Sequence, residues 1–422
     1  MYGDNENKER YSLSDLSYGT SLFNFFQEKY FSAITDLTVA KHHKKLNTED
    51  KNAELLLGGM YLSYGLPDKA SEVFTELLDE ATEATSKSVR DKALYHASKY
   101  YYDSHRYDDA KKYLLKIGDT LSDEFQAEKL YMLINIYIKE GKFKEAIPLL
   151  YAFPANSLWK EYSQFNIATG LIKTQERDKG IDLLKPIAGK EANSYERKIL
   201  KDKSNIAIAY TQLLSSKPDE ANIHFERVRL EGSQTSNALL GLGWTWYQQS
   251  IYDKALIAWL ELANQPFSSS AKQEALITIP NVFEKTDRPS DALHHYDIAI
   301  DNYVSDLSEI NQVIASIKSG SFIQSLSPGA LGIESSNPNI ILKNVGPITN
   351  KYLSALFVSR EFHDAVKNLQ ELRYLGFTLN KWKNNLPALD LILEEKRLTY
   401  NNKIKDNDHR PLLKRSNDLL SK

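Results

Sequence analysis

The sequence predicts an all-α protein built as a solenoid, a stack of similar helix pairs. The first observation is a small residue that returns about every 34 to 41 positions within the same apolar pattern. The second is a pair of amphipathic helical segments around each recurrence. A period of this length with paired helices is characteristic of solenoids, which serve as scaffolds. The recurring small residues, called anchors below, are Ala33, Ala70, Ala110, Ala146, Gly180, Ala221, Ala255, Ala292 and Ala365.

The clearest unit covers Asn52–Leu78 and shows why the pattern favours paired helices. We expect the Leu57-Gly58 step to let the second helix approach the first, and Ala70 to lie where the two helices cross most closely. Phe74 and its counterparts in other units then fill the space between neighbouring units. Because neither helix can bury its apolar face alone, the stacking of units makes one continuous core.

The units are expected to follow one another along the chain. A polar lead-in over residues 1–13 is predicted to be disordered, and about eight units follow over residues 14–303. Pro280 falls inside the first helix of the eighth unit, where it should kink or shorten that helix. Beyond Ala292 the period skips, and the next anchor is Ala365.

The region after the eighth unit has a different composition. Residues 304–349 are expected to form a helix over 305–319 and then an irregular insertion over 321–349, where three prolines and three glycines break helical structure. The insertion also holds ten large apolar side chains. We therefore expect it to be docked, either as a lid or ligand mimic in the groove of the array or as filler before the last unit. Residues 350–403 are predicted to form a last repeat-like unit and a capping helix, and residues 404–422 a polar tail.

Over residues 14–372 the chain resembles the tetratricopeptide-repeat (TPR) family. The resemblance rests on the Leu-Gly step, the following tyrosine, the alanine and the later aromatic residue in units such as NAELLLGGMYLSYGLPDKASEVFTELL. It implies a right-handed superhelical solenoid with a concave groove. More narrowly, YGTSLFNFFQEKYFSAITDL followed by AELLLGGMYLSYGL resembles a group of uncharacterised TPR proteins of gammaproteobacterial cell envelopes. That resemblance implies an exported protein with no known chemistry.

Composition limits the compartment and the class of partner. The net charge of −3 argues against a nucleic-acid-binding surface. The chain has no cysteine, which excludes disulfides and thiolate chemistry and suggests an exported bacterial protein. We expect a periplasmic or cell-envelope location, with the cytoplasm as the alternative because the polar N-terminus is not a signal peptide. No apolar run reaches the roughly 18 residues that a transmembrane segment needs.

The sequence contains no catalytic motif of the common types. It has no G-x-x-x-x-G-K-[ST], no H-E-x-x-H, no G-x-S-x-G and no acidic calcium loop. The pairs His42-His43 and His294-His295 make poor metal sites, because neighbouring helical residues point about 100° apart. We therefore expect no enzyme activity, no metal and no cofactor.

The groove is the predicted binding surface, because the first helix of every unit should line it. Aromatic rings there would supply anchoring contacts, and lysine and asparagine would hold a backbone or a carboxylate. The alternative is that several of these rings pack between helices. The predicted groove residues are Tyr95, Lys99, Tyr102, Tyr131, Asn135, Lys139, Phe165, Lys173, Tyr210, Trp244, Tyr247 and Gln248.

Two functions from different classes follow from this surface. The first is a non-catalytic protein–protein interaction scaffold, which binds an extended segment or a helix of a partner protein within a bacterial envelope assembly. The alternative is a polysaccharide-associated protein of an export or surface-assembly system, whose tyrosine and tryptophan rings stack on sugars. Peptide binding should depend on groove lysine and asparagine, and sugar binding on rings with flanking carboxylates.

Overall fold

A computed structural model describes most of the chain as helices, and no strand occurs among the described residues, so the predicted all-α class is confirmed. The chain divides into two compact units. The first unit comprises Met1–Ser319 and Pro347–Tyr352, and the second comprises Gly320–Gly346 and Leu353–Lys422. In the part of the chain that the structure describes, no helix is both long and apolar enough to span a membrane. The described residues are 16–27, 29–43, 51–79, 85–266, 268–322, 352 and 360–406.

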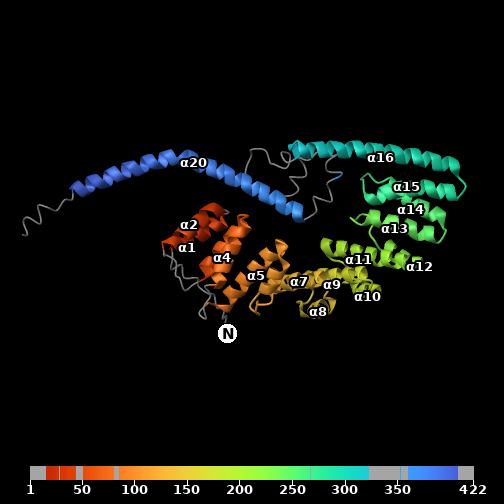
Figure 1. Ribbon diagram of the computed structural model, residues 1–422, viewed down its shortest axis with the longest axis horizontal. Helices are drawn as coiled ribbons and strands as arrows, with labels where there is room; N and C mark the ends of the chain where they lie inside the picture. Colours follow the sequence, from red (N-terminus) through yellow and green to blue (C-terminus); the bar gives the residue numbers. More distant parts are fainter. Residues whose placement is uncertain are drawn as a thin grey trace, which may run out of the picture. The chain divides into compact units, whose positions relative to one another are not determined.

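The first unit is an array of helix pairs that follow one another along the chain (Figure 1). In each pair the two helices pack together across a short turn. The first helices are α1 (Leu16–Phe26), α3 (Asn52–Ser63), α5 (Lys87–Asp103), α7 (Asp123–Lys139), α9 (Leu158–Lys173), α11 (Tyr195–Leu214), α13 (Thr235–Gln248) and α15 (Ser270–Lys285). The second helices are α2 (Tyr30–His42), α4 (Pro67–Asp79), α6 (Tyr107–Leu114), α8 (Phe143–Leu149, followed by the 3-10 turn Leu150–Ala152), α10 (Arg177–Gly189), α12 (Pro218–Glu226), α14 (Tyr252–Ala263) and α16 (Pro289–Lys318).

The first eight anchors lie at the helix crossings, as predicted. Ala70, Ala110, Ala146 and Ala255 are each 0% exposed. The Leu-Gly step has the expected role as well, because a Cβ atom added at Gly58 would lie 2.3 Å from Cε1 of Phe74. No side chain larger than hydrogen fits at that crossing unless the buried ring moves.

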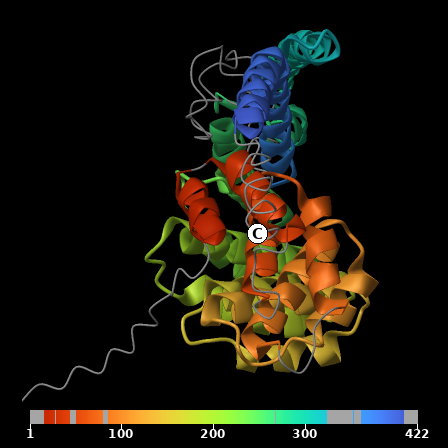
Figure 2. The ribbon, with the colours of Figure 1, turned by 90° about the vertical axis from the view of Figure 1, so that its left-hand side faces the viewer.

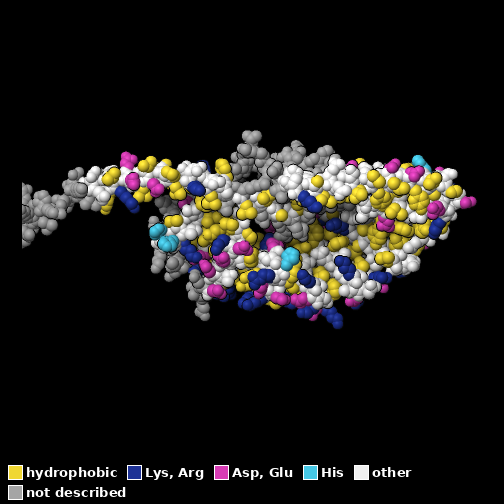
Figure 3. Space-filling model, turned by 45° about the horizontal axis from the view of Figure 1, so that its top comes forward, with side chains coloured by type: hydrophobic (Ala, Val, Ile, Leu, Met, Phe, Trp, Pro, Cys, Tyr) yellow, Lys and Arg dark blue, Asp and Glu magenta, His cyan; other side chains and the backbone are white. Residues whose placement is uncertain are grey.

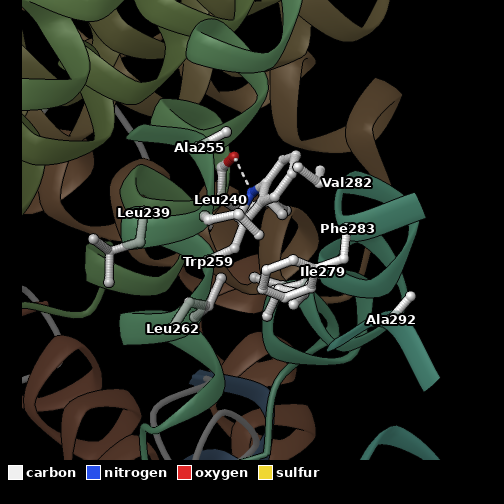
Figure 4. Packing of buried hydrophobic residues seen from close by; sticks show 12 residues of the cluster. Leu239, Leu240, Ala255, Trp259, Leu262, Ile279, Val282, Phe283 and Ala292 are labelled. Carbon is white, nitrogen blue, oxygen red and sulfur yellow. Dashed lines mark hydrogen bonds between the residues drawn. The ribbon is translucent and has the colours of Figure 1, made fainter. Parts of the chain in front are cut away.

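The aromatic residue after the anchor fills the space between neighbouring units. Trp259, four residues after Ala255, is fully buried on α14, between α13 and α15 (Figure 4). Its Nε1 donates a hydrogen bond of 3.2 Å to the carbonyl oxygen of Leu240, so the one polar atom of the ring is satisfied. A Cβ atom at Gly243 would lie 2.0 Å from that nitrogen, which explains the glycine. The predicted continuous core is therefore present at this junction.

From the second pair to the eighth, the turn within the pair contains one residue in the left-handed region, five positions before the anchor. A left-handed residue at this place ends a helix by redirecting the backbone. Gly65 and Gly141 fill the position in two units, but His105, Gln175, Ser216, Ser250 and Asp287 fill it in the others with φ between 56° and 70°. Because most of these residues are not glycine, the turn cannot be recognised from glycine spacing in the sequence.

The first helices form the inner layer of the array. Consecutive first helices contact one another, as α7 does with α9 and α13 with α15, whereas each second helix packs on the first helix of the next pair. In Figure 2 the early pairs, in red and orange, stand in front of the later pairs, in green. Because the first helices approach one another more closely than the second helices do, the first helices line the inner face.

Three elements differ from the prediction. The helix expected at 305–319 is the second half of α16, which continues without a break because no glycine or proline interrupts it after Pro289. Pro280 lies inside α15 without ending it, so the predicted shortening does not occur, and the kink stays a prediction. The second half of the predicted last unit and the predicted capping helix form one helix of 47 residues, α20 (Arg360–Asp406), which extends through Gly376 and Pro387, and Ala365 is exposed on it.

The remaining predictions on domain organisation lie outside the described residues. These are the disordered lead-in over 1–13, the docked insertion from residue 323 to 349 and the polar tail from residue 407 onward. At the start of the insertion, Phe322 is described, and it is 8% exposed. The capping role of the C-terminal helix stays a prediction.

Candidate partner-binding face

One recurring position on the first helices carries the polar contacts of the inner face. It lies eleven residues before each anchor and holds Lys99, Asn135, Tyr210 and Trp244 in four of the units. Each of these side chains interacts with the first helix of the next unit. The positions are equivalent in the repeat, so the contacts form a row along the array, interrupted in the fifth unit, where the hydroxyl of Thr169 donates to carbonyl oxygens of its own helix.

The row is made of short, specific interactions in the middle of the array. Lys99 Nζ on α5 lies 2.7 Å from Glu128 Oε1 on α7. On the next pair of helices, Asn166 Nδ2 donates to Asn135 Oδ1 over 2.9 Å. The contacts fix both partners in one orientation, which reduces the conformational entropy that a ligand would have to remove on binding.

The later units repeat this arrangement with aromatic donors. The Tyr210 hydroxyl donates to the carbonyl oxygen of Asn237 over 2.9 Å, and Trp244 Nε1 donates to Glu274 Oε1 over 2.7 Å. Trp244 is half-buried and meets Tyr247 edge-on at 5.4 Å between ring centroids. One edge of each of these rings is therefore bound to the neighbouring unit, and part of the ring stays accessible.

A second group of rings lies where α7 meets α9. The Tyr131 ring is 4.8 Å from that of Trp159, and Trp159 meets Tyr162 edge-on at 6.4 Å. All three side chains are half-buried. Rings of this kind are preferred anchors for partner proteins because they offer a large apolar area with few rotatable bonds.

Burial keeps the tyrosine hydroxyls of this face protonated. It raises the pKa of Tyr210 and that of Tyr102 to about 12 each. Both hydroxyls are therefore neutral donors throughout the physiological range. At neutral pH the face can offer hydrogen bonds from these residues without adding negative charge.

One predicted groove residue belongs to the core, and a second packs against a core cluster. Tyr95 is 1% exposed, and its ring packs at 4.6 Å from Phe125, while its hydroxyl donates to Glu128 over 2.5 Å. Phe165 is half-buried against the cluster that α9 shares with α10 and α11. The alternative of core packing therefore holds for Tyr95, whereas Phe165 is half-buried, like the face rings Tyr131 and Trp244.

Three other predicted residues lie at the ends of helices. Lys139, Lys173 and Gln248 are the last residues of α7, α9 and α13, and all three are exposed. The ammonium group of Lys139 is 3.9 Å from the ring centroid of Tyr107 on α6, so it faces a second helix. The two lysines also stabilise the helix C-termini through the macrodipole. These three residues lie near the turns, at the edge of the inner layer.

The partners of the row were not found from the sequence. Glu128 and Glu274 both lie eighteen residues before their own anchors, Ala146 and Ala292. They could have been found by asking which residue of one unit faces the polar row of the unit before it. Trp159 lies outside the repeat pattern, and no signal in the sequence marked it.

The residues of this face can bind another molecule through hydrogen bonds and ring contacts. Among the described residues no group of three or more His, Cys, Asp or Glu side chains is placed to hold a metal ion. The face instead presents amide groups, hydroxyls and partly accessible rings along consecutive helices. This combination suits an extended chain or a helix, which needs anchoring pockets and regularly spaced polar partners.

A family match agrees with the helix pairs described above. Residues 206–271 match the family model of the tetratricopeptide repeat, over a segment that runs from α11 to the beginning of α15. These residues therefore form tetratricopeptide repeats, and the anchors, turns and core contacts extend the same construction to the other units. The fold is a TPR solenoid.

Several solved structures are similar to the chain at low sequence identity. The apo form of RapI is 12% identical, with 85% of this chain and 98% of that chain covered and a TM-score of 0.47. The C-terminal part of a TPR repeat-containing protein from Cytophaga hutchinsonii is 14% identical, with 61% and 99% covered and a TM-score of 0.47. A tetratricopeptide repeat protein from Parabacteroides merdae is 15% identical, with 61% and 95% covered and a TM-score of 0.37. The comparison with curated proteins gives no match.

Proposed function

We propose that this protein is a non-catalytic scaffold that binds an extended segment or a helix of a partner protein along the first helices of its array. The observation that supports this function is the row of side chains eleven residues before the anchors. A row that recurs in the third, fourth, sixth and seventh units matches a ligand that is itself long. A compact substrate would need one enclosed site instead.

The binding energy should come chiefly from the rings of this face. Trp244 is the strongest anchor, because its indole is held by Glu274 on one edge and is only half-buried. Asn135, Asn166 and the hydroxyl of Tyr210 supply polar groups that can exchange their present partners for the backbone of a ligand. Anchoring rings and adaptable polar groups are the usual division of labour at protein interfaces.

We also propose that the scaffold acts within a bacterial envelope assembly. Support comes from the absence of cysteine over 422 residues, which fits export to an oxidising compartment. Fractionation of cells that carry the native gene, with antibody detection, tests this location. Recovery in the cytoplasmic fraction would contradict it.

Two tryptophans on one helix provide a matched test of the binding face. Trp244 faces Glu274 on α15, whereas Trp246, two residues further along α13, lies under the ammonium group of Lys254 at 4.2 Å on α14. Peptides selected from a random library against the full chain would be measured by calorimetry against both Trp→Ala variants. We expect Trp244→Ala to weaken binding by roughly 1–4 kcal/mol, the range for an aromatic anchor, and Trp246→Ala to have little effect.

If the two variants bind the peptide with equal affinity, and circular dichroism shows that both are folded, the inner face is not the binding site. The same titration with acidic and neutral oligosaccharides examines the polysaccharide alternative. Saturable sugar binding that Trp244→Ala abolishes, without any peptide binding, would replace the proposed partner class with carbohydrate.

A further inference from the structure

Helix α20 carries an exposed apolar stripe with a period of seven residues. Leu372, Leu379, Leu386, Leu393 and Tyr400 follow one another at this spacing and are each between 50% and 65% exposed. Hydrophobic side chains are visible along this helix in Figure 3. A seven-residue period over several turns is typical of helices that pack along their length on another helix.

A second set of apolar residues completes the pattern. Trp382 and Leu389 follow Leu379 and Leu386 by three positions, and they are 47% and 44% exposed. In heptad notation the leucines are a positions, and these two residues are d positions. Pro387 occupies a b position, so its ring lies away from the stripe and does not obstruct packing there.

We propose that α20 pairs with α20 of a second copy of this chain, in antiparallel orientation. The stripe needs a partner, because a water-exposed helix with so many large apolar side chains is unfavourable. The second copy is favoured by charge complementarity in one register. In that register Leu386 packs against Leu389 of the second copy, and Trp382 packs against Leu393 of the second copy.

The charges beside the stripe select this register. Lys383 and Asp390 occupy e positions, and e positions face one another in antiparallel pairs of helices. With Leu386 opposite Leu389 of the second copy, each Lys383 faces Asp390 of the other chain, which gives two ion pairs by symmetry. A shift of one heptad in one direction would place Lys383 opposite itself, and a shift in the other direction would place Asp390 opposite itself. Like charges so placed are unfavourable.

The parallel orientation lacks this complementarity. It would place Lys383 opposite Thr378 and Asp390 opposite Asn385, with no ion pair. It would also bring the two Lys396 residues, at a d position, face to face at the centre of the interface. In the antiparallel register Lys396 instead lies opposite Leu379, where its aliphatic stem can pack while the ammonium group reaches solvent.

Charge reversal tests both the pairing and its orientation. Light scattering on the full chain should give twice the 48.2 kDa monomer mass at high concentration. Lys383→Asp alone and Asp390→Lys alone should each weaken the dimer by about tenfold or more, because like charges then face one another. An equimolar mixture of the two variants should regain the dimer, since each aspartate then meets a lysine. Failure of the mixture to dimerise would overturn the register.

A matched pair of leucines tests whether dimerisation depends on the stripe or on exposed apolar side chains in general. Leu389 lies on the stripe, and Leu391 lies on the opposite side of α20 and is 68% exposed. Leu389→Ser should shift the protein toward the monomer, whereas Leu391→Ser should leave the dimer intact. The reverse result would assign the interface to the opposite face of the helix.

Cross-linking gives the orientation directly, because the chain has no cysteine of its own. A mixture of Leu379→Cys and Lys396→Cys should form a disulfide-linked dimer on oxidation, while neither variant should do so alone. In the antiparallel register two copies of residue 379 are about 25 Å apart, at 1.5 Å of rise per residue, which is too far for a disulfide. Efficient cross-linking of Leu379→Cys alone would show a parallel pair. A monomer at all concentrations would overturn the proposal and leave the stripe to another element of the same chain.

Discussion

The repeat array and helix α20 contain similar sequence patterns with opposite outcomes. In the array, an alanine such as Ala255 is 0% exposed because the preceding helix crosses it. In α20, Ala365 stands in a comparable apolar context and is exposed. The difference lies in the turn: a left-handed residue precedes each of the anchors from Ala70 to Ala292 by five positions, whereas five positions before Ala365 is Arg360, the first residue of α20. An apolar spacing alone therefore does not define a repeat unit.

The largest difference in stability is expected between alanine substitutions at two adjacent glycines on α3. A Cβ atom at Gly58 would lie 2.3 Å from the buried ring of Phe74, whereas one at Gly59 would meet nothing within 4 Å. Gly58→Ala should cost on the order of 1–3 kcal/mol through overpacking. Gly59→Ala should stabilise by about 0.5–1 kcal/mol, because alanine is the better helix former. Urea denaturation of both variants measures the difference, and equal stabilities would show that the α3–α4 crossing is misplaced.

An alanine-to-leucine substitution should destabilise the array more than it destabilises α20. Ala255→Leu adds three carbon atoms at a closed crossing and should lower the free energy of unfolding by about 1–3 kcal/mol. Ala365→Leu adds the same three carbon atoms at an exposed position of α20 and should change the free energy of unfolding by less than about 0.5 kcal/mol. Thermal unfolding of the two variants, followed by circular dichroism, checks the comparison. A large loss for Ala365→Leu would indicate that a hidden crossing exists there.

An effect confined to acidic pH is expected from a half-buried histidine of the array. His96 on α5 stacks on the Phe74 ring at 5.1 Å, and burial lowers its pKa from 6.5 to about 4. A histidine with a depressed pKa in the folded state stabilises above its unfolded pKa and loses that contribution as the pH falls toward its folded pKa. The array should therefore lose on the order of 1–3 kcal/mol between about pH 6.5 and pH 4 through this residue. His96→Phe should flatten that part of the profile; an unchanged slope would assign the acid sensitivity to other groups.

The sequence was sufficient for the fold because the fold rests on a local, repeated rule. The anchors, the Leu-Gly step and the aromatic residue that follows each lie a fixed number of positions apart, so their roles could be deduced without coordinates. The inner face was predicted only in part. Trp244, Tyr210 and Asn135 lie in the polar row, but Tyr95 is core, because its ring packs against Phe125 of the next first helix.

What could not be predicted depends on contacts between units. Glu128 and Glu274 become part of the face only because the next first helix places them against Lys99 and Trp244. The continuous α20 was missed for another reason. The anchor at Ala365 predicted a separate last unit before the capping helix, yet Gly376, the single glycine between them, costs only about 1 kcal/mol in a helix and does not end it.

Hydrogen exchange followed by mass spectrometry tests the central claim most directly: the array is ordered by its own core, whereas α20 depends on a second copy of the chain. The measurement would be made on the full chain at concentrations on both sides of the monomer–dimer transition. We predict that protection of α13–α15 stays constant across this range, and that protection of α20 between Leu372 and Tyr400 rises with concentration. Protection of α20 that is the same at every concentration would contradict the claim.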